Sequence, residues 1–311
     1  MTTTTSPAQA PRPPASISSA AEPRKRALPR TGYWFLAPYL FFFALFLIWP
    51  IIYGLWMSLT NRSLVTEDSE FAGLSNYGEA LTDPQMWSSL GNTLFFTVIS
   101  SVPLVLVSFV MAYLVYTGLK GQWLWRLTFF APFLLPVSVV TAIWAFLFTN
   151  DFGLVNGLLD KAGLSQVGWL SDERIAMWSI ALVTLWWTVG FNFLLYLSAL
   201  QNIPDHLYEA AQLDGAGTWR RLFSITLPMM KSTTGLIILL QALASLKVFD
   251  QIFLLTAGGP NGATRSILQY IYDSGFTGYR LGYASATSYI FFALIVLVSL
   301  VQMRLAKRKD S

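Results

Sequence analysis

The chain has 311 residues, of which 54% are hydrophobic and only 12% are charged. An ordinary soluble domain carries about 25% charged residues, so this composition is typical of a protein that lies mainly in lipid. The sequence has no Cys and a single His, His206, which excludes disulfides, thiol catalysis and Cys-based metal sites.

Residues 1–33 differ from everything that follows. They are rich in Thr, Pro, Ala and Ser and offer little apolar surface to bury, so they predict a disordered tail. The tail ends in a basic cluster that consists of Arg24, Lys25, Arg26 and Arg30.

A charge-free run extends from Thr31 to Asn61 and is apolar from Trp34 to about Leu59. A helix needs about 20 residues to cross a bilayer core. A secretory signal peptide would have an apolar region of only about 7–15 residues, followed by small residues. This run is longer and has no such cleavage site, so it predicts a retained membrane span.

Further charge-free runs, and one apolar segment interrupted only by Lys247 and Asp250, indicate five more spans. The predicted helices cover residues 34–58, 92–117, 125–148, 175–200, 230–257 and 283–303. The expected fold class is therefore an all-α integral membrane protein with six transmembrane helices. Its transmembrane domain covers residues 34–303, and a basic cytoplasmic segment covers residues 304–311.

The distribution of positive charge predicts the orientation. Most of the 20 Lys and Arg residues lie in the tail, the second and fourth loops and the C-terminal segment, all on one side of the predicted bilayer. Cytoplasmic loops carry such an excess of positive charge, so both termini are expected in the cytoplasm. The chain is thus expected to be a multi-pass protein of a bacterial-type inner membrane. The net charge of +4 thus reflects topology and argues against a nucleic-acid partner.

The fourth loop, residues 201–230, carries the most informative pattern. Pro204 and Asp205 predict a helix start, because Pro fits the first turn and Asp favours the positive end of a helix. Gly215 and Gly217 then break that helix and allow a bend. A second short helix is expected from Thr218 to Ser224. A helix, a glycine bend and a helix on the cytoplasmic face suit docking into a groove on another protein.

This loop resembles that of the permease subunits of binding-protein-dependent ABC importers. In that family the loop has Glu-Ala-Ala, then Gly, then Ile-x-Leu-Pro at fixed gaps. The matching residues here are Glu209, Ala210, Ala211, Gly215, Ile225, Leu227 and Pro228. The resemblance extends over nearly the whole apolar part. Similarity to the branch of the family that transports sugars, such as maltose and glycerol phosphate, lies in residues 71–77, 89–93, 132–136, 248–250 and 255–260 and in Trp144, Gly153 and Asn156.

The resemblance implies a type I ABC importer permease fold with a cytoplasmic coupling helix. It implies several partners: a dimer of ATPase subunits, a second homologous permease, an extracytoplasmic solute-binding protein and a sugar substrate, all at the lipid bilayer. Glu209 would contact the ATPase, the two Ala residues would allow close approach, and Gly215 would set the bend. The alternative for Glu209 is a solvated helix charge, and His206 is expected to be a surface residue.

ATP and Mg²⁺ would bind the partner ATPase, since this chain has no Gly-x-x-x-x-Gly-Lys-Ser/Thr phosphate loop. No cofactor and no metal site are expected in the chain itself, and it is not expected to be an enzyme.

Polar residues within the predicted spans are candidates for the substrate path. A charge at the centre of a membrane costs about 2.5–3.5 kcal/mol, so it needs a partner or a watery cavity. The alternative is that Lys247 and Asp250 pair with each other or with the second permease. Trp186 and Trp187 suit stacking on sugar rings, but they suit packing against neighbouring helices at least as well. The path candidates are Asn192, Gln241, Ser245, Lys247, Asp250 and Gln251.

Other functions remain open at this point. The same architecture would also import a non-sugar metabolite, because the loop motif is shared across branches of the family. A secondary transporter would keep six spans without needing the loop or an ATPase. A membrane enzyme is disfavoured, because the spans lack clustered His or Cys residues and a facing carboxylate pair.

Overall fold

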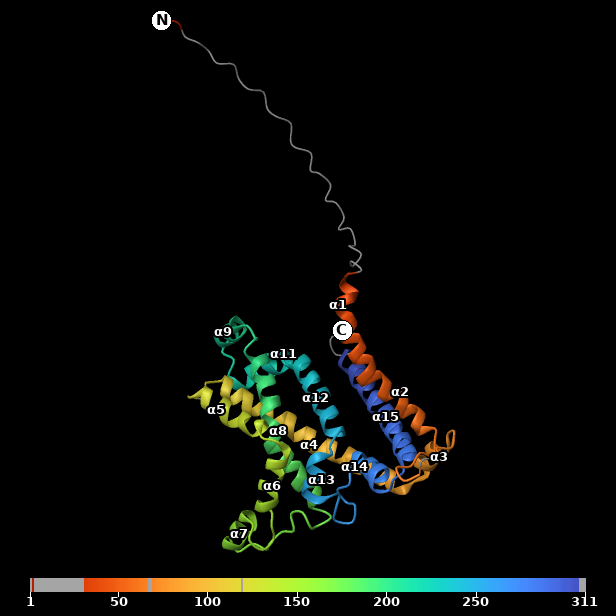
Figure 1. The fold of residues 1–311 in the computed structure, drawn as a ribbon. Coiled ribbons are helices and arrows are strands. Elements are labelled where there is room, and N and C mark those ends of the chain that lie inside the picture. Colours follow the sequence, from red (N-terminus) through yellow and green to blue (C-terminus); the bar gives the residue numbers. More distant parts are fainter. Residues whose placement is uncertain (1, 3–30, 67–68, 119, 308–311) are drawn as a thin grey trace. The chain divides into compact units, whose positions relative to one another are not determined.

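The computed structural model describes residues 2, 31–66, 69–118 and 120–307. Regular structure in these residues is helical, apart from an isolated antiparallel bridge between Thr60 and Phe71. The chain divides into two compact units, one ending at Ile51 and one beginning at Ile52, which are described separately. Apart from Thr2 and residues 31–33, the predicted tail lies outside the described residues. Figure 1 shows the fold, with most helices labelled.

The first unit is an apolar helical segment. It contains α1 (Thr31–Phe43), the π-helical turn η1 (Ala44–Ile48) and the start of α2 (Trp49–Ser58). From Phe35 to Ile51 every side chain is exposed, and nearly all are apolar. Such a surface is unfavourable in water and is suited to lipid. The helix from Phe35 to Ser58 is long and apolar enough to cross a membrane.

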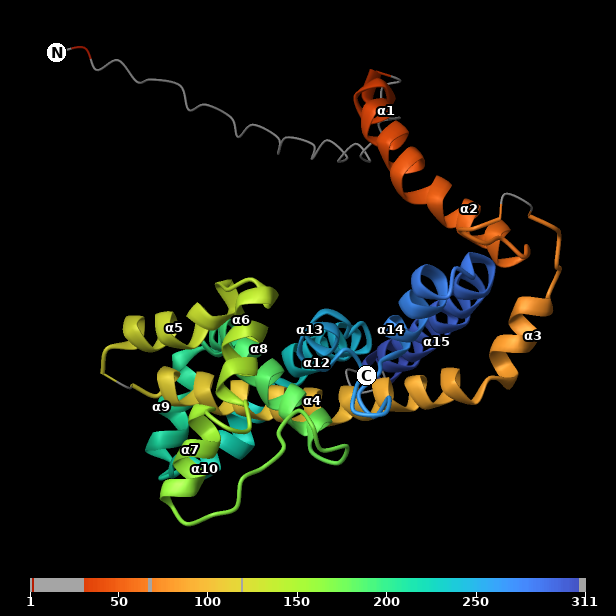
Figure 2. The ribbon, with the colours of Figure 1, turned by 60° about the horizontal axis from the view of Figure 1, so that its bottom comes forward.

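The second unit is built around α4 (Pro84–Tyr116), α8 (Ala176–Leu200) and α12 (Lys231–Leu246). Helix α4 packs most extensively against α8 and α12, and Figure 2 shows it lengthwise. Its 33 residues correspond to about 50 Å at 1.5 Å per residue, which exceeds the thickness of a bilayer core. Phe193, Tyr196 and Leu200 of α8 are buried in the largest apolar cluster of this unit.

The start of α4 is fixed by Asp83. Its side chain accepts a hydrogen bond from the backbone N–H of Gln85 at 2.7 Å and bonds from the hydroxyls of Tyr270 and Tyr283. Burial raises the pKa of Asp83, but these hydrogen bonds outweigh burial and leave the pKa below its usual value. Asp83 therefore joins α4 to α14 (Ile267–Tyr272) and α15 (Leu281–Lys307).

The span predicted over residues 125–148 consists of two helices. Helix α5 (Gln122–Phe130) leads through the 3₁₀ turn η2 (Ala131–Leu134) into α6 (Val137–Leu147), and the two parts are bent by 96°. Pro136 has no N–H to continue the helix, which explains the break. The indole N–H of Trp187 donates to the carbonyl oxygen of Leu135 at 3.1 Å, so a side chain of α8 provides the hydrogen bond for this backbone carbonyl at the bend.

The segment predicted as one helix over residues 230–257 is also divided. Helix α12 ends before Lys247, and α13 (Asp250–Thr256) begins after a break at residues 247–249. Phe249 has φ of −145° and ψ of −62°, which is not helical. Asp250 lies in the first turn of α13, where a negative charge is favourable.

Shorter helices and turns complete the second unit. They are α3 (Ser75–Thr82), α7 (Leu154–Lys161), α9 (Asp205–Leu213), α10 (Thr218–Arg221), η3 (Leu222–Thr226), α11 (Leu227–Met229) and η4 (Asp273–Thr277). Helix α15 continues through residues 304–307 of the predicted C-terminal segment, and residues 308–311 lie outside the described part.

By length and composition, four helices of the described chain are able to span a membrane. They cover Phe35–Ser58, Pro84–Tyr116, Ala176–Leu200 and Leu281–Arg304. Two bent pairs raise the number to six if each pair counts as one span: Gln122–Leu134 with Val137–Leu147, and Thr218–Met229 with Lys231–Leu246. The fold is thus an all-helical membrane protein with four to six candidate spans.

Candidate functional site

The first arm of the 201–230 loop is α9, which begins directly after Pro204. Leu207 and Tyr208 pack against the apolar cluster formed by α4, α8 and α12. Glu209 and Ala210 are exposed, whereas Ala211 is half-buried. His206 is exposed, as expected. Helix α9 therefore rests on the core along one side and presents the Glu209 side to its surroundings.

Gly215 ends α9 in a Schellman motif. Its φ of +73° lies in the left-handed region, which costs an L residue more than Gly. The N–H of Gly215 donates to the carbonyl of Gln212 at 3.0 Å, and the N–H of Ala216 donates to that of Ala211 at 2.8 Å. These two bonds satisfy carbonyls at the helix end and turn the chain, so Gly215 produces the bend that the sequence predicts.

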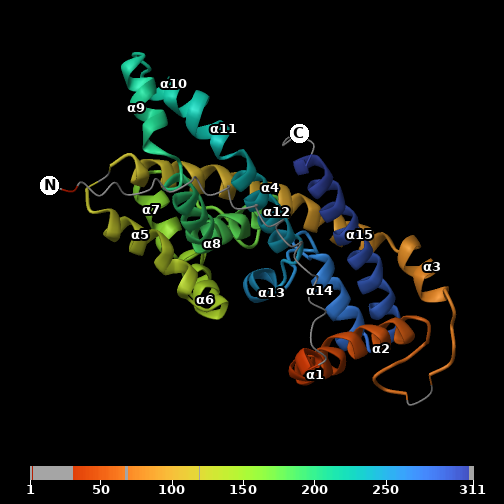
Figure 3. The same ribbon diagram turned by 90° about the horizontal axis from the view of Figure 1, so that it is seen from above.

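The second arm runs without interruption through α10, η3 and α11 (Figure 3). Ile225 and Leu227 are half-buried, and Pro228 lies in the first turn of α11. The hydroxyls of Tyr208 and Thr226 are 2.9 Å apart and join the two arms. Thr226 is fully buried and ends η3, so this bond holds α9 against the second arm of the loop.

Large apolar side chains of the loop are exposed. Leu213 is 90% exposed, Trp219 73% and Phe223 61%, and the rings of Trp219 and Phe223 stack with centroids 6.2 Å apart. Arg220 lies beside them and is also exposed. A bent pair of short helices that carries exposed aromatic rings has the character of a protein-binding surface.

A buried polar cluster lies between α4, α8 and α12. The amide of Asn192 donates to Gln241 Oε1 at 2.8 Å, and Gln241 Nε2 donates to Ser245 Oγ at 3.0 Å. Ser245 Oγ is also 3.0 Å from Ser100 Oγ and 3.2 Å from Ser101 Oγ. Three of the path candidates, Asn192, Gln241 and Ser245, are thus brought together in one network.

The other three path candidates lie at the break that follows α12. Lys247 and Asp250 are exposed, and within the described residues neither forms an ion pair. Of the alternatives to the path, pairing of Lys247 with Asp250 is thus absent from the described residues. Gln251 is half-buried and donates to Thr184 of α8 at 3.4 Å. Of the two aromatic candidates, Trp187 packs beneath the α5–α6 bend, whereas Trp186 is partly exposed.

Several site residues were not predicted from the sequence. Ser100 and Ser101 bond to a residue more than 140 positions away, so no local pattern indicates their role. Tyr208 and Thr226 lie within the recognised loop but outside its fixed positions. The sequence indicates the contact between these two residues only indirectly: the bend at Gly215 allows the two arms of the loop to approach each other.

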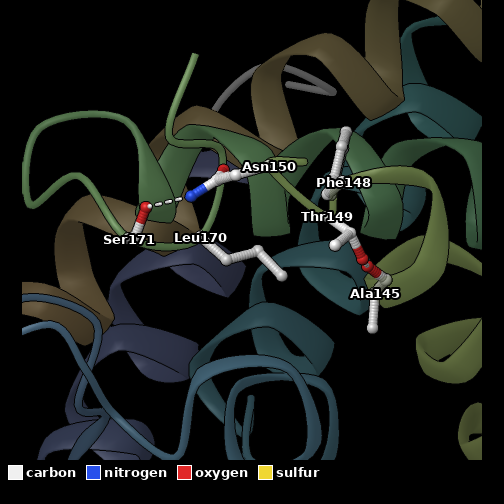
Figure 4. Close-up of a pocket in the computed structure, with 6 residues that line it drawn as sticks. All are labelled: Ala145, Phe148, Thr149, Asn150, Leu170 and Ser171. Atoms are coloured by element: carbon white, nitrogen blue, oxygen red, sulfur yellow. Dashed lines mark hydrogen bonds between the residues drawn. The ribbon is translucent and has the colours of Figure 1, made fainter. Parts of the chain in front are cut away.

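A cavity of about 240 Å³ lies at the end of α6 (Figure 4). On one side of it, Asn150 Nδ2 donates to Ser171 Oγ at 3.3 Å (Figure 4). Small-molecule pockets commonly measure about 300–1,000 Å³, so this cavity is smaller than a typical ligand pocket. In the described part of the chain, no group of three or more His, Cys, Asp or Glu side chains is placed to hold a metal.

Comparison with known proteins identifies related chains over most of the sequence. Residues 93–311 match the family described as binding-protein-dependent transport system inner membrane component. The probable ABC transporter permease protein YurN of Bacillus subtilis is 35% identical over 88% of this chain and 95% of its own length. The trehalose/maltose permease MalF of Thermococcus litoralis is 33% identical over 90% of this chain and 95% of its own.

A further relative and a solved structure agree with these matches. The sulfoquinovosyl glycerol permease SmoG of Agrobacterium fabrum is 33% identical over 88% of this chain and 90% of its own. The crystal structure of a bacterial ABC transporter that imports the acidic polysaccharide alginate matches with a TM-score of 0.80 and 24% identity. It covers 89% of this chain and 95% of that one. At this identity the likeness concerns the fold.

Proposed function

The chain belongs to the family of binding-protein-dependent transport system inner membrane components, and we propose that it imports a sugar, as its named relatives suggest. It is a transmembrane permease of an ABC importer and a non-catalytic subunit, because the family leaves ATP binding to the ATPase partner. Its proposed complex contains that ATPase as a dimer, an extracytoplasmic binding protein and a second homologous permease.

The 205–228 loop is the proposed contact with the ATPase. The observation that supports this most is the bent pair of helices whose outer side exposes Glu209, Trp219 and Phe223 while Tyr208 and Thr226 fix its inner side. A loop fixed to the ends of α4 and α12 transmits force, whereas a freely moving loop would not. Ala210 and Gly215 leave room for a close approach at the centre of this surface.

The proposed substrate path passes the polar cluster and the break after α12. Gln241, Ser245 and Asn192 offer amide and hydroxyl groups, which suit the hydroxyls of a sugar. Lys247 and Asp250 are exposed beside them, so they require a watery path or groups of the second permease. Gln251 lies one residue further along α13.

The cargo is inferred from the relatives. Named relatives are permeases for trehalose and maltose, sulfoquinovosyl glycerol and sn-glycerol-3-phosphate. These compounds share a polyhydroxyl carbon skeleton, which makes a sugar or a sugar derivative the preferred substrate class. A non-sugar metabolite is the second candidate, because the coupling motif does not depend on cargo. The excess of Lys and Arg in the N-terminal, loop and C-terminal segments supports cytoplasmic termini.

The test is ATP-dependent uptake of a panel of sugars by the complete complex in proteoliposomes. The permease would be co-expressed with the partner genes, and Glu209→Lys would be compared with Asp214→Lys, an exposed position of the same loop outside the motif. Uptake of one sugar that needs the ATPase and falls only in Glu209→Lys is expected. Uptake that ignores ATP, or that is confined to a non-sugar metabolite, would overturn the proposal.

A further inference from the structure

We propose that α7 lies in the surface of the bilayer, with an apolar face in contact with phospholipid. This face consists of Leu154 and Leu158 of α7 together with Phe152, which lies two residues before the helix, and is called the α7 apolar face below. All three side chains are exposed in the folded chain. The inference depends only on the chain being an inner membrane protein and is independent of its cargo, its orientation and its coupling loop.

The eight residues of α7 present three different sides. Val155, Asn156 and Leu159 point to the protein, and Val155 packs near Phe148 and Trp169. Leu154 and Leu158 are one turn apart on a second side. Asp160 is exposed and lies on a third side, away from both leucines at 100° per residue. A helix with one protein side, one apolar side and one charged side fits the boundary between lipid and water.

Asn156 holds α7 firmly in this position. Its side chain is 1% exposed. Its amide donates to the carbonyl of Val167 at 3.0 Å, and its Oδ1 accepts from the N–H of Val167 at 3.1 Å and from the indole of Trp169 at 3.0 Å. The returning segment is thus fastened to the inner side of α7, so the leucines cannot turn inward to escape water.

Lipid is the occupant because the α7 apolar face continues the membrane surface of α6. Phe146 and Ile143 of α6 are exposed, and α6 belongs to a bent pair that is apolar enough to span the membrane. The ring centroids of Phe146 and Phe152 are 6.1 Å apart, so the exposed ring that precedes α7 lies against the exposed side of α6. Lys161 lies near the leucine side and is exposed, and its long side chain suits the level of the phosphate groups.

Spin labelling tests this placement directly, since the chain has no Cys to remove. Leu154→Cys, Leu158→Cys and the matched control Asp160→Cys would each carry a nitroxide in the assembled complex in liposomes. Collision rates with oxygen, which concentrates in lipid, and with a water-soluble nickel chelate would be measured. Retained thermal stability and uptake would confirm that each labelled protein is folded.

We expect oxygen collisions to exceed nickel collisions at positions 154 and 158 and the order to be reversed at position 160. Nickel collisions that dominate at all three positions would place α7 in water and overturn the proposal. Protection of positions 154 and 158 from both reagents would show that a protein covers the face, which overturns it as well. Uptake and ATPase coupling are measured separately, so failure here leaves the proposed function untouched.

Discussion

The Gly215→Ala substitution tests whether the shape of the 205–228 loop sets coupling to the ATPase. Nothing lies within 4 Å of a Cβ added at this position, so the substitution causes no clash. Its cost is conformational, because a left-handed backbone costs an L residue about 1–2 kcal/mol. Ala also stabilises the folded chain by about 0.4–1 kcal/mol through the unfolded state, which obscures the effect in a single variant.

Gly217→Ala is the matched control. Gly217 lies in the same loop, is equally open and has a φ of −67°, which Ala adopts without strain. The unfolded-state contribution is common to both variants and cancels. Gly217 is the N-cap of α10, and at an N-cap Gly stabilises a helix by roughly 0.5 kcal/mol more than Ala does. The remaining difference is about 0.5–1.5 kcal/mol. The Gly215→Ala variant relieves this strain by relaxing the turn in the free permease, so docking must form the turn again, and the difference then corresponds to about a 2- to 12-fold change in affinity.

The assay is the affinity of the ATPase dimer for the permease pair in nanodiscs. Gly215→Ala is expected to bind about 2- to 12-fold more weakly than Gly217→Ala. Gly215→Asn should recover part of the loss, because Asn tolerates the left-handed conformation at a helix end. Equal affinities for the two Ala variants would refute the reasoning, since docking would then not depend on the Schellman turn.

Three further predictions concern the fold. Gly190→Ala should lower the free energy of unfolding by about 1–3 kcal/mol through overpacking, because the added Cβ would lie 2.8 Å from Phe130 Cα. The control Gly235→Ala, whose added Cβ meets no atom within 4 Å, should not lower it. Gln241→Leu should cost about 1–3 kcal/mol in an unfolding assay, because Asn192 loses its acceptor; failure of the added change Asn192→Leu to recover part of this would refute a shared network. The pKa of Asp83 lies below its usual value, so its stabilising effect is complete above about pH 4 and is lost as the pH falls through the folded pKa. Asp83→Asn should therefore be less stable at neutral pH and show a flatter melting-temperature profile below about pH 4; an unchanged profile would contradict this.

Local chemistry explains what could be predicted of the site. A Pro followed by Asp begins α9, and a Gly in the left-handed region ends it; both depend on residues adjacent in sequence. The uninterrupted apolar runs that became α4 and α8 are equally local signals. The role of the loop in coupling, and the residues of the substrate path, remain predictions.

Tertiary contacts explain what could not be predicted. The break after α12 lies in an apolar pattern that reads as one helix, and only Lys247 and Asp250 marked the place. The α5–α6 bend had a proline signal, but its 96° angle depends on contacts with α8. The polar cluster joins three helices that are far apart in sequence, so its hydrogen bonds follow from packing and not from spacing.

The length of α4 has a mechanical consequence. At one end, Asp83 is bonded to Tyr270 and Tyr283; at the other, the ring of Tyr116 lies 6.3 Å from that of Tyr208 in the 205–228 loop. Helix α4 extends for about 50 Å, and Pro103 in its interior removes one backbone hydrogen bond at that point. A displacement imposed on the loop would therefore reach the Asp83 end of α4 through this one helix, and Pro103 is the point at which α4 is expected to bend.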